Sequence, residues 1–315
     1  MKIIRGFQKF PLLGSPTVVA IGNFDGLHLG HQKILRFLVE RSQKKRLSSL
    51  VLTFYPHPET TLGKGKIAMI QTLSQRLKDI KKFGIQAVLV TPFNKTFSNL
   101  SSEAFIQKML VNTLKAKEVI VGENFRFGKN REGGVARLKQ LGSQFGFIVH
   151  SIPPQKKKGR IVSSSLIRKL LLQGKVEEAN VFLGRFYQIE GRVIKGEERG
   201  RILGFPTANI QTVNEILPHG VFISLAEIHS QIYPSLTNVG KRPTFEGKGL
   251  VIESHLMDFN QKVYGRKIKL SFLKKIREEK SFPTPQSLSN QIEKDLEVAR
   301  GFFHSKPRLI DSAIK

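Results

Sequence analysis

Cysteine is absent from this chain of 315 residues. Its absence excludes disulfides, thiolate catalysis and iron–sulfur clusters. A zinc site, which needs three or four ligands, is not expected either, because the chain has only eight histidines to supply them. The chemistry is therefore expected to use oxygen and nitrogen groups together with a hard cation.

Long apolar runs are also missing. No stretch approaches the length that spans a bilayer, and the first six residues carry no apolar signal core. Hydrophobic residues make up 40% of the chain, which indicates a globular protein, and the length suffices for two domains with separate cores. We expect a soluble protein that stays in the cytoplasm.

Acidic residues are few: 24 Asp and Glu stand against 52 Lys and Arg, for a net charge of +28. Such a balance is typical of nucleic-acid binders. Apart from residues 156–160, however, the basic residues are scattered, and no zinc knuckle, basic heptad or aromatic RNA-binding signature is present. Nucleic acid is not expected as a partner, because a basic surface also suits an enzyme with phosphorylated ligands. The oligomeric state stays open.

The most informative segment is residues 22–31, which follows an apolar run and leads into a helical pattern. A strand that ends in glycines and opens a helix leaves backbone amides free to bind phosphate. His28 and His31 lie three apart and therefore share one helical face. A nucleoside triphosphate is the expected ligand, although two histidines could also merely cap and pack. The expected nucleotide-binding residues of this turn are Gly22, Phe24, Asp25, Gly26 and Gly30.

The role of Asp25 is open at this stage. The carboxylate could orient a histidine or help to hold a metal ion. It could equally bond nearby backbone amides, as aspartates in turns commonly do.

Strand and helix patterns alternate from residue 17 to about residue 153. Apolar runs predict strands at 18–21, 49–55, 87–93, 118–125 and 147–152, and helices at 31–45, 73–83, 102–114 and 135–145. This alternation predicts an α/β fold with a doubly wound parallel sheet, whose ligands bind at the carboxyl ends of strands. Segments 22–31 and 122–128 both fall at such ends.

A different pattern begins near residue 188. Two short helices are expected first, at 164–172 and 176–183. Short alternating segments at 189–194, 221–228, 251–259 and 268–274 then predict an antiparallel β-barrel, and a long helix should run from Thr284–Pro285 to Phe303. We therefore predict a first domain over residues 1–183 and a second, small barrel domain with a C-terminal helix over residues 184–315.

Two further motifs of the first domain carry polar groups. Asn124, beside Phe125 and Phe127, suits an aromatic ring ligand, although both phenylalanines could simply be core. Ser164, Ser165 and Arg168 at the start of a helix form a second possible phosphate site, although serines also cap helices in general.

These motifs together resemble a known family. Gly-x-Phe-Asp-Gly-x-His-x-Gly-His, Val-Gly-Glu-Asn-Phe-x-Phe-Gly and Ser-Ser-Ser-x-Ile-Arg resemble, in order and spacing, the nucleotidyltransferase half of the prokaryotic bifunctional riboflavin kinase/FAD synthetases. Residues 200–209, Gly-Arg-Ile-Leu-Gly-Phe-Pro-Thr-Ala-Asn, resemble the kinase half, as do segments 191–196, 217–222, 238–245, 253–259 and 277–282. Departures from the family pattern are Ser165 for threonine, Leu166 for arginine and Phe222 for tyrosine.

The resemblance implies two reactions: ATP phosphorylates riboflavin to FMN, and a second ATP adenylylates FMN to FAD with release of pyrophosphate. It implies that His28 and His31 stabilise the adenylyl transfer, that Thr207 and Asn209 hold Mg²⁺, and that Glu253 is the general base of the kinase. In isolation, Thr207 and Asn209 would be a solvent-facing polar edge and Glu253 an ordinary strand residue. The remaining implied site residues are Asn124, Ser164, Ser165, Arg168, Gly196, Gly200 and Arg201 for nucleotide, and Asn124, Phe125, Phe127, Phe205 and Arg277 for flavin.

Overall fold

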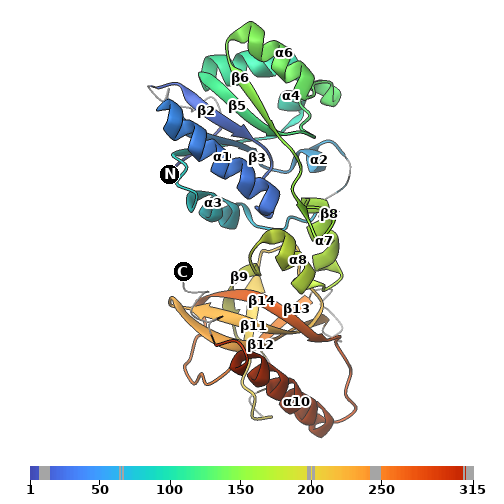
Figure 1. Ribbon diagram of the computed structural model, residues 1–315. Helices are drawn as coiled ribbons and strands as arrows, with labels where there is room; N and C mark the ends of the chain where they lie inside the picture. Colours follow the sequence, from blue (N-terminus) through green and yellow to red (C-terminus); the bar gives the residue numbers. More distant parts are fainter. Residues whose placement is uncertain are drawn as a thin grey trace. The chain divides into compact units, whose positions relative to one another are not determined.

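The computed structural model describes residues 1–6, 15–63, 65, 67–196, 200, 203–241, 250–307 and 309. The chain forms two compact units, Met1–Ser164 and Ser165–Lys315, each of which is described by itself (Figure 1). Among the described residues, no helix is both long and apolar enough to cross a membrane.

The first unit is an α/β unit with one six-stranded sheet. Its elements are β1 (Lys2–Arg5), β2 (Thr17–Ile21), α1 (Leu29–Lys45), β3 (Ser48–Phe54), α2 (Pro58–Thr61), α3 (Leu73–Lys81), β4 (Ala87–Thr91), α4 (Lys95–Ser98), α5 (Ser102–Phe105), the π-helix η2 (Ile106–Thr113), β5 (Ala116–Gly122), the 3-10 helix η3 (Lys129–Arg131), α6 (Val135–Phe145), β6 (Ile148–Ile152) and the short hairpin β7 (Lys156–Lys157) and β8 (Arg160–Ile161).

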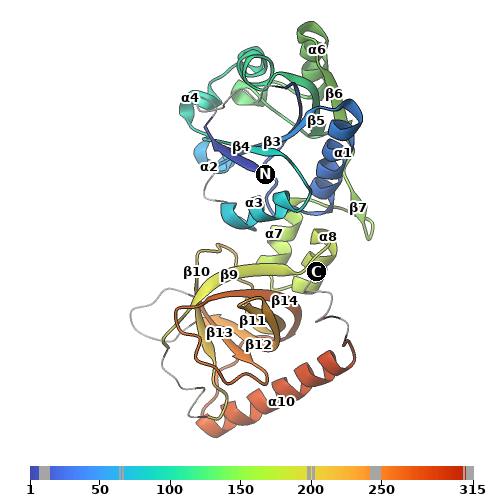
Figure 2. The same ribbon diagram turned by 90° about the vertical axis from the view of Figure 1, so that its left-hand side faces the viewer.

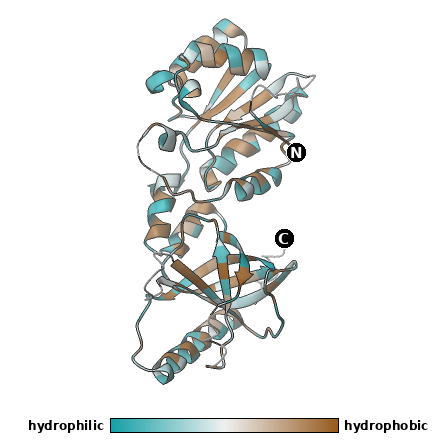
Figure 3. Cartoon of the chain, turned by 180° about the vertical axis from the view of Figure 1, so that it is seen from behind, coloured by the Kyte–Doolittle hydropathy of each residue, from teal (hydrophilic) through white to brown (hydrophobic). Residues whose placement is uncertain are grey.

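All pairs in this sheet are parallel, in the order β1-β4-β3-β2-β5-β6. Alternate strand residues face opposite sides. Val18 and Ala20 pack with α1 and α3, whereas Val19 and Ile21 pack with η2 and α6. Figure 2 shows the helices on both faces of the sheet, and Figure 3 shows its strands as strongly hydrophobic segments. The predicted doubly wound sheet is confirmed.

The strand order identifies where a ligand should bind. From β2 the chain first builds outward through β3 and β4, and it then crosses to the other side of β2 for β5 and β6. The order therefore reverses between β2 and β5. In open parallel sheets the ligand crevice lies outside the carboxyl ends of the strands at this reversal. Those ends are Ile21 and Gly122, which lead directly into the two predicted motifs.

The second unit contains a closed six-stranded antiparallel barrel. Its elements are α7 (Ser164–Leu172), α8 (Val176–Leu183), β9 (Tyr187–Ile194), β10 (Ala208–Thr212), β11 (Gly220–Ile228), β12 (Gln231–Lys241), β13 (Leu250–Leu256), β14 (Lys267–Arg277) and α10 (Pro285–His304). The barrel order is β10-β13-β12-β11-β14-β9, with β9 and β10 closing it. Helix α10 lies along the outside of the barrel (Figure 2), where Leu296, Ala299 and Phe303 pack on Val221 and Ile223 of β11.

The barrel interior holds a chain of four hydroxyl groups. Ser224 Oγ lies 2.8 Å from Ser235 Oγ and 2.6 Å from Thr237 Oγ1, which lies 2.9 Å from Ser254 Oγ. All four side chains are fully buried. Because each hydroxyl both donates and accepts, the chain satisfies its own members without water.

Several elements differ from the expectation. Residues 102–114, predicted as one helix, form α5 followed by the π-helix η2. Strands β1, β10 and β12 were not predicted: β1 is a short edge strand, and β12 contains Pro234 and Gly240, which weaken its strand pattern. The predicted strands that reach Phe93 and Phe125 end earlier, since these rings pack on the core beyond the ladder.

Helices α7 and α8 lie on the other side of the division from the one expected. The prediction ended the first domain at residue 183, whereas Ser165 already begins the second compact unit. Asn180 of α8 donates from Nδ2 to the Phe272 carbonyl of β14 (2.9 Å) and accepts the Tyr187 amide of β9 (2.7 Å). Whether residue 183 bounds an independently folding module stays a prediction.

The packing of α8 gives that prediction a sharper form. A chain that begins at Gly184 should be less stable than one that begins at Ser165 by about 5 kcal/mol or more, because it lacks several apolar side chains that α8 buries. These side chains are Val176, Ala179, Phe182 and Leu183. Urea unfolding of both chains measures the difference, and a chain from Lys175, which keeps α8 but lacks α7, is the control. Equal stability of the chains from Ser165 and Gly184 would contradict the role of α8.

Candidate functional sites

The turn after β2 has a fixed backbone conformation. Gly26 has φ +77°, and a Cβ at this position would lie 2.9 Å from Cδ1 of Ile70, so conformation and space both require glycine. Phe24, with φ 51°, buries its ring completely. The carboxylate of Asp25 accepts the backbone amides of Ile70 and Gln71 at 3.1–3.2 Å. Of the open roles for Asp25, the structure thus shows the one that bonds backbone amides, here from a distant loop.

His28 and His31 lie together at the start of α1, as the spacing predicts. Their rings stack with centroids 3.6 Å apart and planes 15° apart. His28 also caps α1, since its Nδ1 accepts the His31 amide at 3.3 Å. Because Nδ1 accepts, a neutral His28 carries its ring proton on Nε2. Capping and ligand binding are therefore compatible in one residue.

His31 is uncharged at neutral pH. Burial, with smaller contributions from the neighbouring His28 and Arg76, holds the pKa of His31 well below its usual value of 6.5. Its Nδ1 is buried and has no hydrogen-bond partner among the described residues. A neutral imidazole beside a helix N-terminus can donate one hydrogen bond to an anion without bringing a second buried charge.

Arg76 and His57, neither of which the sequence pattern predicted as a site residue, contact Asn23 of this turn. Arg76 of α3 is fully buried, and its Nη1 donates to the Asn23 carbonyl at 2.8 Å. The Asn23 side-chain amide lies 2.9 Å from Nε2 of His57, which caps α2. His57 could have been noticed in the polar segment after a predicted strand. Arg76 resembled any other cation of an amphipathic helix.

Aromatic side chains gather beyond the carboxyl ends of β3, β4 and β5. Their ring centroids form a continuous series with neighbours 5.5–6.0 Å apart; the members are Phe93, Phe54, Phe97, Phe105, Phe127 and Phe125. Phe127 is buried and therefore acts as a core residue, whereas Phe125 is half-buried and keeps part of its ring exposed. Asn124 is exposed in the turn beside them. The structure thus brings a polar side chain and an aromatic edge to the same strand end.

Ser164 lies at the start of α7, as predicted. Its Oγ donates to the Asp25 carbonyl at 2.9 Å, so this hydroxyl is attached to the turn after β2. Ser165 and Arg168 follow in α7 but belong to the second compact unit. Their part in nucleotide binding stays a prediction.

In the barrel, three polar residues form a row across neighbouring strands. Glu253 of β13 lies directly opposite Asn209 of β10 on one side and Asn238 of β12 on the other. Directly opposed residues share a face, with Cβ atoms about 5 Å apart. Val221, which pairs with Asn238, packs towards α10, so the row lies on the outer face that carries this helix. Asn238 was not among the predicted site residues, and its Oδ1 is buried without a partner among the described residues.

Gly196 and Gly200 both lie against the predicted metal ligands. Gly196 lies against the Asn209 side chain, and a Cβ at Gly200 would lie 3.1 Å from Thr207 Oγ1, so any side chain at either glycine would fill this space. Oxygen donors from Thr207 and Asn209 fit a hard cation such as Mg²⁺, which takes few protein ligands and completes its shell with phosphate and water. Within the described ranges, no cluster of three or more His, Asp or Glu residues offers an alternative cation site. Arg201 lies outside the described residues.

The two flavin candidates of the barrel differ in their surroundings. Phe205 is half-buried at the edge of the α10 cluster, and its amide donates to the Gly200 carbonyl at 2.7 Å. Arg277 is engaged with α10: its Nε and Nη2 contact the buried Asp295 carboxylate at 2.8–3.1 Å, and Nη1 donates to the Glu278 carbonyl. The pair fixes α10 against the barrel, and a direct flavin contact by Arg277 stays a prediction.

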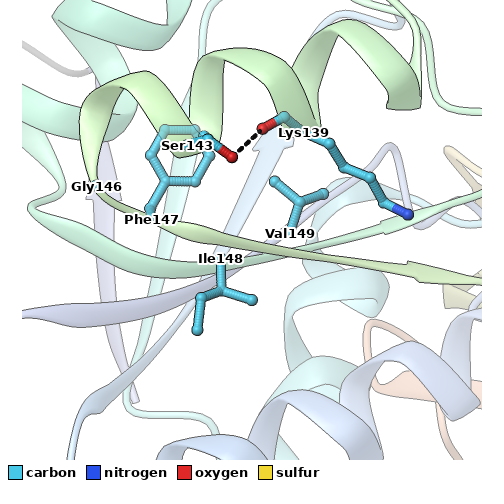
Figure 4. Close-up of a pocket in the computed structure, with 7 residues that line it drawn as sticks. Lys139, Ser143, Gly146, Phe147, Ile148 and Val149 are labelled. Carbon is cyan, nitrogen blue, oxygen red and sulfur yellow. Dashed lines mark hydrogen bonds between the residues drawn. The ribbon is translucent and has the colours of Figure 1, made fainter.

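A surface hollow of the first unit lies away from these residues. It measures about 450 Å³ between α6 and the start of β6, and is lined by Lys139, Gly142, Ser143, Gly146, Phe147, Ile148 and Val149 (Figure 4). Because it opens at the amino end of β6, it faces the side of the sheet opposite to the reversal point.

Comparison with known proteins agrees with this geometry. The family model described as FAD synthetase matches residues 13–166, and the one described as riboflavin kinase matches residues 183–303. The bifunctional riboflavin kinase/FMN adenylyltransferase of Buchnera aphidicola subsp. Schizaphis graminum is 38% identical over 96% of this chain and 99% of its own length. The chain belongs to this family. The relative of the same name from Haemophilus influenzae is also 38% identical, over 97% of this chain and 100% of its own.

A similar structure is known for nearly the whole length of this chain. A solved structure named as a macrolide-efflux protein from Streptococcus pneumoniae has a TM-score of 0.88 at 29% identity, over 95% of this chain and 99% of that one. Within the family's two parts, the His28/His31 turn, Asn124 and Ser164 fall in the FAD synthetase match, and the Glu253 row falls in the riboflavin kinase match. Arg168 lies between the two matches.

Proposed function

We propose that this chain makes FMN from riboflavin and ATP in its barrel unit, and FAD from FMN and a second ATP in its α/β unit. The observation that carries the proposal is the placement of the polar motifs. The two histidines stand at the reversal point of the parallel sheet, and Glu253 stands directly opposite Asn209 on the barrel. We place both reactions in the cytoplasm, where ATP and free flavin are available and a chain without cysteine needs no oxidative folding.

In the adenylyl transfer, an FMN phosphate oxygen attacks the α-phosphorus of ATP, and the bond to the pyrophosphate oxygen breaks. No protein nucleophile is needed, so catalysis consists of positioning and charge stabilisation. His28 donates from Nε2, and neutral His31 donates beside it, to phosphate oxygens as their charge grows. The amides at the start of α1, together with Ser164, steady the leaving pyrophosphate. Asn124 orients the substrate beside Phe125.

In the phosphoryl transfer, the terminal ribityl hydroxyl of riboflavin attacks the γ-phosphorus of ATP and ADP leaves. Glu253 takes the proton of that hydroxyl. Thr207 and Asn209 would hold Mg²⁺, which would neutralise charge on the phosphates when bound. The backbone amides of Gly196 and Gly200 cover the phosphates, because these two glycines lie against the two metal ligands. The unpartnered Asn238 Oδ1 beside Glu253 offers an acceptor for the substrate's hydroxyls.

Product analysis with and without metal tests this proposal. Incubation of the protein with riboflavin, ATP and Mg²⁺ should yield both FMN and FAD by chromatography. An excess of a chelator should stop both reactions, because oxygen ligands hold a hard cation that the chelator removes. Added Mg²⁺ should restore both products. Undiminished turnover in the chelator would contradict the metal assignment, and formation of neither flavin nucleotide under any condition would contradict the proposed function.

A further inference from the structure

Arg76 is the largest fully buried side chain among the described residues, although it is also the most strongly basic kind of side chain. A guanidinium that is buried is costly unless it is paired with an acid and its donors are satisfied. No described ion pair involves Arg76. Burial lowers the pKa of Arg76 and has the larger effect, whereas the Asp25 carboxylate raises that pKa and offsets part of the burial. The protein therefore balances this buried cation only in part.

Only one nitrogen of the Arg76 guanidinium has hydrogen-bond acceptors among the described residues. Nη1 donates to the Asn23 carbonyl at 2.8 Å, with longer contacts of 3.4 Å to Thr53 Oγ1 and the Phe54 carbonyl. Nε and Nη2 are buried with no partner within the same residues. Unsatisfied buried donors are rare in proteins and mark either strain or a functional site.

The acceptors of Nη1 all belong to the carboxyl ends of β2 and β3. Asn23 is the second residue after β2, in the turn that leads to His28 and His31. Thr53 Oγ1 also donates to the Asn23 carbonyl, at 3.1 Å. The Arg76 side chain therefore ties α3 to the turn whose other end carries His28 and His31. The charge of Arg76 also reaches this turn, since it contributes to the low pKa of His31.

The geometry points to Arg76 as a positioning residue of the adenylyl-transfer site. Its hydrogen bond to the Asn23 carbonyl fixes the turn that leads from β2 to His28 and His31. Its permanent and only partly neutralised charge lies close to this turn, where the polyphosphate binds. The Asp25 carboxylate supplies part of the negative charge that balances this cation, and the nucleotide then supplies the rest. The inference rests on the proposed function of the α/β unit and adds a residue to it.

The test uses the full chain with three substitutions, Arg76→Gln, Arg76→Lys and Arg36→Gln. Glutamine removes the charge, and lysine keeps the charge but loses the fork of donors. Arg36 is an exposed arginine of α1, so its substitution removes an equal charge from the surface of the same unit. FAD formation from FMN and ATP gives kcat and the KM for ATP. FMN formation from riboflavin in the same preparations serves as an internal control of protein concentration, because it takes place in the other unit. The melting transition of each protein reports whether the α/β unit is folded.

Arg76→Gln should lower kcat/KM for ATP in FAD formation about 100-fold, as expected for loss of a preorganised charge near the reacting phosphates. Arg76→Lys should keep the KM for ATP within about twofold of the unsubstituted chain, while kcat falls about tenfold because the turn is held less well. Arg36→Gln should leave both constants unchanged, and FMN formation should be normal in all three.

The kinetic constants of Arg76→Lys test whether Arg76 is a positioning residue even where Arg76→Gln does not fold. Unchanged kcat and KM in Arg76→Lys would overturn the inference, since the fork of donors to the turn would be dispensable. Unchanged constants in a folded Arg76→Gln protein would overturn it too, as would a KM in Arg76→Lys as high as in Arg76→Gln. Failure of the unsubstituted chain to form FAD would instead refute the proposed function of the unit.

Discussion

Replacement of Glu253 by glutamine should lower the rate of FMN formation about 100-fold or more, as expected for the loss of general-base catalysis. Glutamine keeps the size and hydrogen-bonding reach of the side chain, and it stands at the same register position opposite Asn209 and Asn238. What it cannot do is accept the proton of the ribityl hydroxyl. FAD formation from added FMN should continue at its usual rate, because that reaction belongs to the other unit.

A matched control separates chemistry from charge. Glu227 lies on β11 of the same barrel, where it is half-buried and paired with Lys269. Glu227→Gln removes the same charge from the barrel without touching the row of Glu253, so FMN formation should be nearly unchanged. Equal losses in both variants, or a normal rate in Glu253→Gln, would exclude Glu253 as the general base.

Removal of both histidines should have the opposite effect. In a chain with His28→Ala and His31→Ala, FAD formation should fall by about 10²- to 10³-fold or more, because donors to a developing charge are lost. Riboflavin should still be consumed, so FMN should accumulate. The measurement is a time course of all three flavins by chromatography after addition of riboflavin and ATP.

His304→Ala provides the control for this double substitution, since His304 lies exposed at the end of α10. The His28 cap also contributes to α1, for which an alanine costs about 1 kcal/mol, so the melting transition should be recorded for each protein. Loss of both activities in a chain that melts normally would refute the assignment of the two reactions to separate sites.

The architecture of both units was accessible from sequence because hydrophobic period and turn chemistry agree over most of it. The predicted bounds of α7 and α8 are confirmed to the residue, and the parallel sheet and the barrel are confirmed in kind. The π-helix η2 was not accessible, since its sequence has the same apolar spacing as an α-helix. Strand β12 was hidden by a proline and a glycine, which are residue types that argue against a strand in the sequence.

The site residues could be predicted from sequence where a local backbone motif identifies them. Glycines and histidines at a strand-to-helix turn predicted that His28 and His31 lie together, and the structure stacks their rings. Contacts that join distant segments could not be predicted: Asp25 with the amides of residues 70–71, Arg76 with Asn23, and Arg277 with Asp295. Each depends on a tertiary approach that no local pattern encodes.

The hydroxyl chain inside the barrel favours one register of the strands that carry Asn238 and Glu253 on the outer face. A slip of any strand by one residue would turn Ser224, Thr237 or Ser254 outward and bring one of its chain neighbours into the barrel interior. The remaining hydroxyls would then lack partners, at a cost that a wholly apolar interior would not impose. The interior thus discriminates against misaligned strand pairings. Glu253 and Asn238 are the immediate chain neighbours of Ser254 and Thr237, so the same discrimination keeps them facing each other on the outer surface.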